Sequence, residues 1–438
     1  MSDPIVYWNA GVETAERAEL EAMQLAGLRR TVAQALRTPF YRTRLAHAGV
    51  RSAEDLRTLS DLERLPFTTK SDLREAYPDG LLAVDRAEVV RLHTSSGTTG
   101  TPTVIYHTRE DLENWTELLA RCIVSTGATR ADVFQNMMTY GLFTGGLGLH
   151  YGAERAGLLV IPSGAGNTAR QLRLMKDFRS TVLHATPSYM LHLHSKMAEE
   201  GYRVEDLCLT KAYLGGEPYS ENTRGKIESL FRIDVYNSYG LSEMNGPGVA
   251  FECVRKHGMH IWEDSYIIEM SDPRRGTPLA DGEEGELVLT TLRRTATPIL
   301  RYRTGDITAL LGGACPCGRT HRRMARVTGR CDDMLILNGV NVYPQQIEQI
   351  LMRIPGVGTN YLIDLDKAGA LDRLTVKVEI QDYLFTGDVS ELEALKARIA
   401  EDVKSGVLVR PVVELHEHGA LPAFEMKAKR VTDLRPKE

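Results

Sequence analysis

The sequence predicts an α/β fold with a large first domain and a smaller second domain of α+β character. Short β-rich runs alternate with helical stretches between residues 89 and 310, and after residue 332 the pattern changes to strand-like runs followed by an amphipathic helix. A chain of 438 residues is also too long for one compact core. We therefore expect residues 1–331 to form the large domain and residues 332–438 the small one.

The elements of the first domain follow from their residue types. Leu25, Leu28 and Val32 recur at helical spacing and predict a helix from about residue 13 to residue 36. Strands are predicted in TPTVIYH, GLLVIPS, RIDVYNSYG and GELVLTTL, and helices over residues 168–178 and 221–231. This alternation indicates an α/β domain.

The second domain shows a different pattern. The run MLILNGVNVYP precedes LTVKVEI, in which Val376, Val378 and Ile380 alternate as in a strand. A helix follows, with Leu392, Leu395, Ile399 and Val403 on one face.

Composition and charge exclude several classes of protein. Lys and Arg number 53 against 58 Asp and Glu, the net charge is −5, and the two signs are interspersed, which argues against nucleic-acid binding. No apolar run approaches the ~20 residues of a membrane helix, and the first residues lack a secretory pattern. Six cysteines are too few for a disulfide scaffold. We expect a cytoplasmic protein without membrane partners, its cysteines being thiols or metal ligands.

A loop rich in glycine and hydroxyl side chains is the most informative local motif. It runs from Thr94 to Pro102 with the sequence TSSGTTGTP and leads directly into an apolar strand. Glycine allows backbone N–H groups to approach phosphate oxygens, and Ser or Thr hydroxyls add further donors. The loop is not a Walker A motif, because no Gly-Lys-Ser/Thr follows. A polar surface turn is the alternative interpretation.

Further motifs follow this loop in a fixed order. They are GGEP at 215–218, YGLSE at 239–243, RYRTGD at 301–306 and GRCDD at 329–333. This series resembles the adenylate-forming superfamily of acyl-CoA synthetases, luciferases and peptide-synthetase adenylation domains. The segments at 140–148, 186–189, 246–249, 260–264 and 341–344 resemble those of phenylacetate-coenzyme A ligases in particular.

The resemblance implies a two-step reaction. A carboxylate attacks the α-phosphate of ATP to give an acyl-adenylate and pyrophosphate, and a thiol then displaces AMP. ATP, Mg²⁺ and coenzyme A would be required, with a small aryl or arylacetic acid as substrate. A homodimer is compatible with this family.

The resemblance also assigns the nucleotide site. The pyrophosphate would lie against Ser95, Ser96, Gly97, Thr98, Thr99 and Gly100, the adenine against Gly215, Gly216, Glu217, Pro218, Asn237, Ser238, Tyr239 and Gly240, and the ribose against Asp306, with Arg330 at the domain boundary. The catalytic residues would be Thr98, Glu243 as the Mg²⁺ carboxylate and Lys427. Asn237 and Met426 stand where the family usually has Asp and Gly.

The family likewise implies a mobile small domain. Asp332 is expected to be its hinge, so that the domain presents Lys427 for adenylation and then turns the region of Gly339 and Val340 toward the thiol. The alternative for Asp332 is a plain solvated turn, and the alternative for Lys427 is a solvated charge near the C-terminus.

An acyl pocket and a metal site complete the expectations. The acyl wall would comprise Tyr140, Gly141, Phe143, Thr144, Gly145, Gly146, Pro187, Gly246 and Pro247. His184, His192 and His194, on or near one helical stretch, receive no role.

A zinc site is also expected. Its ligands would be Cys315, Cys317, Cys253 and either His260 or His257, which are the ligand types of a closed structural zinc site. The resemblance favours His260, and free thiols are the alternative.

Two rival functions remain open at this level. An adenylate-forming enzyme could pass the activated group to an amine or to a carrier-protein thiol instead of coenzyme A. A non-catalytic nucleotide-binding relative is the second rival, against which the joint presence of Glu243, Asp306 and Lys427 argues.

Overall fold

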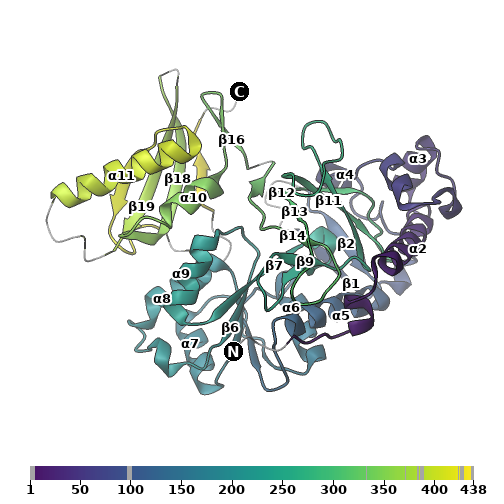
Figure 1. Cartoon of the computed structure of the whole chain (residues 1–438), viewed down its shortest axis with the longest axis horizontal. Helices are drawn as coiled ribbons and strands as arrows, with labels where there is room; N and C mark the ends of the chain where they lie inside the picture. Colours follow the sequence, from purple (N-terminus) through teal and green to yellow (C-terminus); the bar gives the residue numbers. More distant parts are fainter. Residues whose placement is uncertain are drawn as a thin grey trace.

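A computed structural model of the chain divides into a large and a small body (Figure 1). It describes residues 5–95, 101–331, 333–369, 371–381, 384, 389–422, 424 and 429–435. The predicted fold class is confirmed: a large α/β part is followed by a smaller α+β part.

The centre of the large part is a nine-stranded sheet with strand order β13-β14-β9-β8-β7-β6-β5-β3-β4. Five strands pair in parallel and alternate along the chain with helices: β3 (Val133–Asn136), α6 (Gly145–Ala156), β4 (Leu159–Ile161), α7 (Thr168–Asp177), β5 (Val182–Ala185), α8 (Pro187–Met197), β6 (Lys211–Leu214), α9 (Glu221–Phe231) and β7 (Asp234–Leu241). The antiparallel strands are β8 (Gly246–Glu252), β9 (Met259–Ile261), β13 (Leu310–Leu311) and β14 (Arg323–Met324). The parallel strands end at one edge, where ligand sites of α/β sheets form.

Two smaller sheets and several helices pack beside this sheet. A hairpin is formed by β1 (Arg91–Thr94) and β2 (Val104–His107), and a four-stranded sheet by β10 (Tyr266–Ser271), β11 (Gly285–Thr291), β12 (Tyr302–Thr308) and β15 (Gly329–Arg330). The helices are α1 (Ala10–Glu13), α2 (Arg17–Ala35), α3 (Pro39–His47), α4 (Lys70–Glu75) and α5 (Arg109–Ser125).

The helix predicted from residue 13 begins four residues later. Glu16 precedes α2 and forms a capping box with Glu19, which satisfies backbone N–H groups of its first turn. The apolar residues Leu28 and Val32 lie in the core, as their spacing predicts. The predicted start was wrong because apolar spacing does not mark the cap.

The small part has its own hydrophobic core. Its sheet has the order β20-β19-β18-β21, its elements being β16 (Leu335–Leu337), β17 (Val340–Val342), α10 (Pro344–Leu351), β18 (Val357–Ala368), β19 (Leu371–Ile380), α11 (Val389–Val407), β20 (Val412–His416) and β21 (Val431–Asp433). Val376, Val378 and Ile380 are buried there, as predicted. In Figure 1, α10 faces α9 of the large part.

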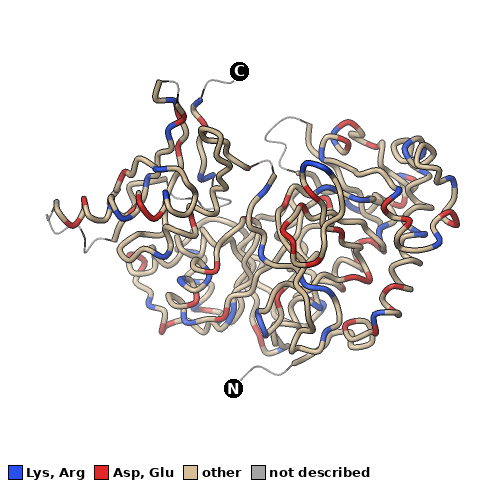
Figure 2. Tube along the Cα trace, turned by 45° about the horizontal axis from the view of Figure 1, so that its top comes forward, with Lys and Arg blue, Asp and Glu red and all other residues tan. Residues whose placement is uncertain are grey.

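Surface charge is distributed without a dominant sign. Figure 2 shows Lys and Arg intermixed with Asp and Glu over both parts, as the sequence suggests. Among the described residues, no helix is both long and apolar enough to cross a bilayer.

Candidate active site

The predicted site segments meet at the carboxyl edge of the parallel strands. Each lies in the connection that follows one strand: 140–146 after β3, 186–187 after β5, 215–218 after β6 and 239–243 at the end of β7. Glu217 contacts the neighbouring connection, because its Oε1 accepts a hydrogen bond of 2.7 Å from the backbone N of Ser188. Strand order therefore assembles residues that are up to about a hundred positions apart.

The predicted phosphate loop is closed at its base by a pair of residues. Ser95 N donates to Thr103 O at 3.1 Å, and Thr103 N donates to Ser95 Oγ at 3.0 Å. The base also contacts the 140–146 connection, because Thr94 N donates to Leu142 O at 3.1 Å. The remaining predicted loop residues Ser96, Gly97, Thr98, Thr99 and Gly100 lie outside the described residues.

Glu243 lies directly beside the base of this loop. It is buried on a short 3₁₀ helix between β7 and β8, and its Oε1 accepts a hydrogen bond of 3.4 Å from Thr103 Oγ1. Arg294, itself buried, donates to Glu243 O at 2.6 Å and to Asn245 Oδ1. A carboxylate oxygen held next to a phosphate loop is a suitable Mg²⁺ ligand, so the residues fit the ion that the resemblance implies.

Asp306 is held between two side chains from other strands. Tyr239 OH donates to its Oδ2 and Arg330 Nη1 donates to its Oδ1, both at 2.6 Å. Asp306 and Arg330 are direct partners in the β12–β15 pairing. Burial and the adjacent carboxylate raise the pKa of Tyr239 well above its usual value, so the phenol keeps its proton. Each carboxylate oxygen has more than one acceptor site, which leaves capacity for ribose hydroxyls.

The glycines of the predicted adenine side permit close backbone contact. A Cβ at Gly215 would lie 2.4 Å from Ser238 O, so no larger residue fits between β6 and β7. Asn237 is buried beside it, and its backbone N donates to Glu252 Oε2 at 2.7 Å. Pro218 lies in the connection after β6, and Gly240 lies near the end of β7.

The predicted acyl wall follows β3 and includes residues that its motif did not reveal. Tyr140 OH accepts a hydrogen bond of 2.8 Å from Asn136 Nδ2 and lies 3.1 Å from His150 Nδ1. Asn136 Nδ2 also donates to Gly146 O at 2.7 Å, and its Oδ1 lies 3.0 Å from His184 Nδ1. Burial raises the pKa of Tyr140 to about 12 and lowers that of His184 to about 3, so both are uncharged at neutral pH.

His184 thus has a place that the sequence interpretation missed. It lies on β5 and not on the following helix. A polar residue at the end of an apolar strand was the available signal. Met138 was missed as well. Its Cε would lie 3.4 Å from a Cβ added at Gly145 and from one added at Gly216, so it lies between the acyl wall and the adenine side.

The remaining acyl-wall residues lie around the start of α6. Thr144 Oγ1 is 3.4 Å from Ser242 Oγ, and a Cβ at Gly246, where φ is +112°, would approach Thr144 Oγ1 to 2.4 Å. Pro247 O accepts a hydrogen bond of 2.8 Å from Trp115 Nε1. Phe143 is 42% exposed and Gly141 has open space around it, which puts them at the rim of the wall, and Pro187 begins α8.

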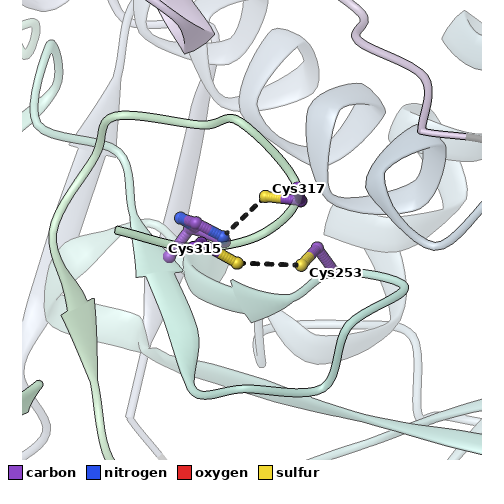
Figure 3. A group of neighbouring side chains, drawn as sticks. Cys253, Cys315 and Cys317 are labelled. Atoms are coloured by element: carbon purple, nitrogen blue, oxygen red, sulfur yellow. Dashed lines mark hydrogen bonds between the residues drawn. The ribbon is translucent and has the colours of Figure 1, made fainter. Parts of the chain in front are cut away.

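A separate cluster of thiols and one imidazole matches the predicted zinc ligands. The ligand atoms of Cys253, His260, Cys315 and Cys317 all lie within 4.8 Å of one another, and all four residues are buried. Figure 3 shows the three cysteine side chains pointing toward one another. His260 Nε2 lies 3.3 Å from Cys317 Sγ, while its Nδ1 lies 3.3 Å from His321 O. His257 is instead bound by Arg323, whose Nη1 donates to its Nδ1 at 2.9 Å.

The surroundings of this cluster fit a charged metal–thiolate group. Arg319 Nη1 is buried without a hydrogen-bond partner among the described residues. Burial lowers the pKa of Arg319, but the Glu13 carboxylate and the Cys317 sulfur raise it by more, so the net shift is upward. The Arg319 cation therefore lies close to the thiols. Three sulfurs and one nitrogen are an accepted tetrahedral zinc set.

The predicted hinge and the predicted catalytic lysine are not among the residues that the structure describes. Asp332 and Lys427 lie outside the described residues, as does Met426. Described residues before and after Lys427 bind the small part: Leu421 N donates to Glu379 Oε1 at 2.9 Å, and Arg430 Nη1 donates to Asn360 Oδ1 at 2.8 Å. Both anchors lie on the β18–β19 pair.

Two family models match the chain. Residues 23–292 match the AMP-binding enzyme family, and residues 339–435 match the AMP-binding enzyme C-terminal domain. A phenylacetate-coenzyme A ligase of Thermus thermophilus is 46% identical over 97% of this chain and 98% of its own. Another, of Aromatoleum evansii, is 44% identical over 98% of this chain and 97% of its own.

A solved relative is similar over the whole chain. The 2-hydroxyisobutyryl-CoA ligase in the postadenylation state with R3-HIB-AMP is 29% identical, with a TM-score of 0.91 over 98% of this chain and 92% of that one. The same ligase with 2-HIB-AMP and CoA in the thioesterification state, aligned over the same shares of the two chains, has a TM-score of 0.72. With both family models and full-length relatives in agreement, the chain belongs to the AMP-binding enzyme family and, within it, to the phenylacetate-coenzyme A ligases.

Proposed function

We propose that this protein is an ATP-dependent ligase that converts an aryl or arylacetic acid into its coenzyme A thioester through an acyl-adenylate. The observation that carries the proposal is the convergence of the phosphate-loop base, Glu243 and Asp306 at one sheet edge, in a chain whose relatives are named phenylacetate-coenzyme A ligases. ATP and coenzyme A are its co-substrates.

The first half-reaction needs fixed charges more than a general base. An oxygen of the acid attacks the α-phosphorus of ATP, a P–O bond forms, and the bond to pyrophosphate breaks. In this proposal Asp306 accepts hydrogen bonds from the ribose and so orients the α-phosphate. Glu243 would hold Mg²⁺, which would supply charge neutralisation at the phosphates. Ser95 with Ser96, Gly97, Thr98, Thr99 and Gly100 would hold the leaving pyrophosphate.

The second half-reaction reuses the pocket after the small domain has turned. The coenzyme A sulfur attacks the acyl carbonyl carbon, and AMP leaves with the electrons of the mixed-anhydride bond. We assign residues 1–331 and 332–438 to the two domains, Asp332 to the hinge and Lys427 to the cation that contacts the reacting groups during adenylation. The matched C-terminal family model from residue 339 supports this division.

The acyl wall suits an aromatic ring. Tyr140 and Phe143 supply aromatic faces. The absence of a side chain at Gly145 lets the Phe143 ring pack closely there, because a Cβ at Gly145 would lie 2.6 Å from Phe143 Cε1. The hydrogen bonds of Tyr140 OH to Asn136 and His150 satisfy its polar atom, so an apolar ring does not leave it unpaired.

We further propose that Cys253, His260, Cys315 and Cys317 bind a structural Zn²⁺. The four protein ligands leave no open position, which favours a structural over a catalytic ion. A set of three reduced thiols is compatible with a cytoplasmic location.

One experiment tests the proposed function and the acceptor together. Purified protein with ATP and Mg²⁺ is screened with aryl and arylacetic acids for pyrophosphate release, with coenzyme A, hydroxylamine, an amine or no acceptor. We expect acid-dependent pyrophosphate release, and thioester only with coenzyme A. An acyl-adenylate that reacts with an amine but not with coenzyme A would overturn the assigned acceptor, and absence of AMP with every acid would overturn the function.

A further inference from the structure

The small domain is held against the large one by a buried carboxylate. Glu348 lies on α10, and its Oε1 accepts hydrogen bonds from Ser220 N at 3.3 Å, from Ser220 Oγ at 3.2 Å and from Thr223 Oγ1. Glu348 is only 6% exposed. Burial raises its pKa, whereas the hydrogen bonds from Thr223 and Ser220 lower it.

The partner of this carboxylate is the beginning of a helix. Ser220 is the N-cap of α9, and its Oγ accepts a hydrogen bond from Thr223 N at 3.2 Å. The first N–H groups of a helix lack partners within the helix, and this end is electropositive. A carboxylate from another domain therefore binds here through both hydrogen bonds and the helix dipole.

Three further hydrogen bonds join α9 to the small domain. Asn222 Nδ2 donates to Gln349 O at 3.0 Å. Lys226 Nζ lies 3.3 Å from Val357 O and 3.4 Å from Gly358 O. Burial lowers the pKa of Lys226, in keeping with its enclosed position. All of these contacts depend on one relative orientation of the two domains.

This orientation corresponds to one state of the solved relative. The full chain superimposes far better on the postadenylation state than on the thioesterification state of the same ligase, with TM-scores of 0.91 and 0.72. Moreover, α9 directly follows the 215–218 connection of the nucleotide site. A rotation of the small domain would separate Glu348 from Ser220 and Thr223.

We propose that Glu348 is a positioning residue that fastens the small domain in the orientation of the relative's postadenylation state and must leave α9 before thioester formation. This inference rests on the proposed function. The described partners of Glu348 are Ser220 and Thr223, neither of which is assigned to ATP or acid binding. Its effect is therefore on the balance between the two orientations and hence on the relative rates of the two half-reactions.

The test compares both half-reactions in the full chain. In Glu348→Ala we expect pyrophosphate release to slow about tenfold, since a charge-assisted contact is lost, while thioester formation from supplied acyl-adenylate and coenzyme A stays constant or accelerates. Glu348→Gln retains an acceptor oxygen and should show a smaller change. Glu417→Ala, an exposed carboxylate of the same domain, is the control and should change neither rate.

A second measurement is independent of catalysis. The distribution of distances between spin labels on α3 and α11 should broaden in Glu348→Ala and in Thr223→Val. The double variant should show little broadening beyond that of either single variant. Equal slowing of both half-reactions, or unchanged distances in both single variants, would overturn the inference. If the wild type forms no adenylate, the proposed function fails, whereas the distances still decide whether Glu348 fastens the domains.

Discussion

At the residue scale, the central feature is a carboxylate that is already oriented before any nucleotide binds. Asp306 is held by Tyr239 and Arg330, which come from two different sheets. Such pre-orientation reduces the ordering that ATP binding must impose. The arrangement could not be predicted from spacing, because Arg330 meets Asp306 through strand pairing and Tyr239 reaches it from another sheet.

Replacing Asp306 tests the proposed ribose contact. In Asp306→Asn we expect the KM for ATP to rise about ten- to hundredfold, because charge-assisted hydrogen bonds are lost. The KM for the acid should change little. Tyr239→Phe removes one hydroxyl and keeps the ring, so it serves as the milder control. An unchanged KM for ATP in Asp306→Asn would contradict the assignment.

Lys427 is tested through the separated half-reactions. Lys427→Ala should lower the rate of pyrophosphate release by about 10²- to 10³-fold, the usual cost of losing one oriented donor at a transition state. Thioester formation from supplied acyl-adenylate should survive better. Lys429→Ala is the matched control two residues away. Unchanged pyrophosphate release in Lys427→Ala would remove this residue from the mechanism.

At the element scale, the connection after β3 is shaped by one buried amide. Asn136 binds Tyr140 OH, Gly146 O and the His184 ring together. Asn136→Ala should lower the stability by about 1–3 kcal/mol, because buried polar groups lose their partners. We also expect a higher KM for the acid and little change in the KM for ATP. Thermal unfolding measures the loss of stability, and steady-state kinetics measures the two KM values. Equal changes in both KM values would argue against a specific acyl wall.

The loop that carries Cys315 and Cys317 of the proposed zinc site also binds the N-terminal segment. Tyr7 OH donates to Cys317 O at 2.7 Å, and the buried pair of Arg319 and Glu13 joins the same two segments at 2.6 Å. The Cys315–Cys317 loop and residues 5–13 are therefore expected to lose order together.

Removing the metal tests this coupling. Elemental analysis should find about one zinc per chain, as expected for one four-ligand site. Chelation or Cys315→Ser should lower the melting temperature and expose residues 5–13 to proteases. Cys208→Ser, outside the cluster, is the control. Metal-replete protein without zinc would dispose of the site.

At the scale of the whole molecule, several buried uncharged histidines make stability sensitive to acid. Burial lowers the pKa of His184 to about 3 and of His321 to about 4. Burial also lowers the pKa of His107 well below its usual value, with Arg294 and His93 adding to the effect. In the unfolded chain these groups take up protons near pH 6.5, whereas in the folded chain they do not. The contribution of these histidines to the free energy of unfolding is therefore fully present above about pH 6.5 and is lost as the pH falls toward their folded-state pKa values.

Urea unfolding at pH 7.5 and pH 5 measures this loss. We expect a lower free energy of unfolding at pH 5. His107→Phe should reduce the difference, because His107 stacks on Trp115 and both of its ring nitrogens are buried without partners among the described residues. A pH dependence in His107→Phe as steep as in the wild type would contradict this account.

By itself the sequence determined the fold class, the family and the chemical character of the site, because hydrophobic periodicity and ordered motifs are properties of short segments. Only the tertiary structure decided which distant groups meet. It selected His260 over His257 at the thiols, paired Asp306 with Tyr239 and Arg330, joined His184 to the acyl wall and seated Glu348 on Ser220. These contacts depend on strand order, domain packing and the burial of particular atoms, and none of these is a property of the short segments in which the motifs lie.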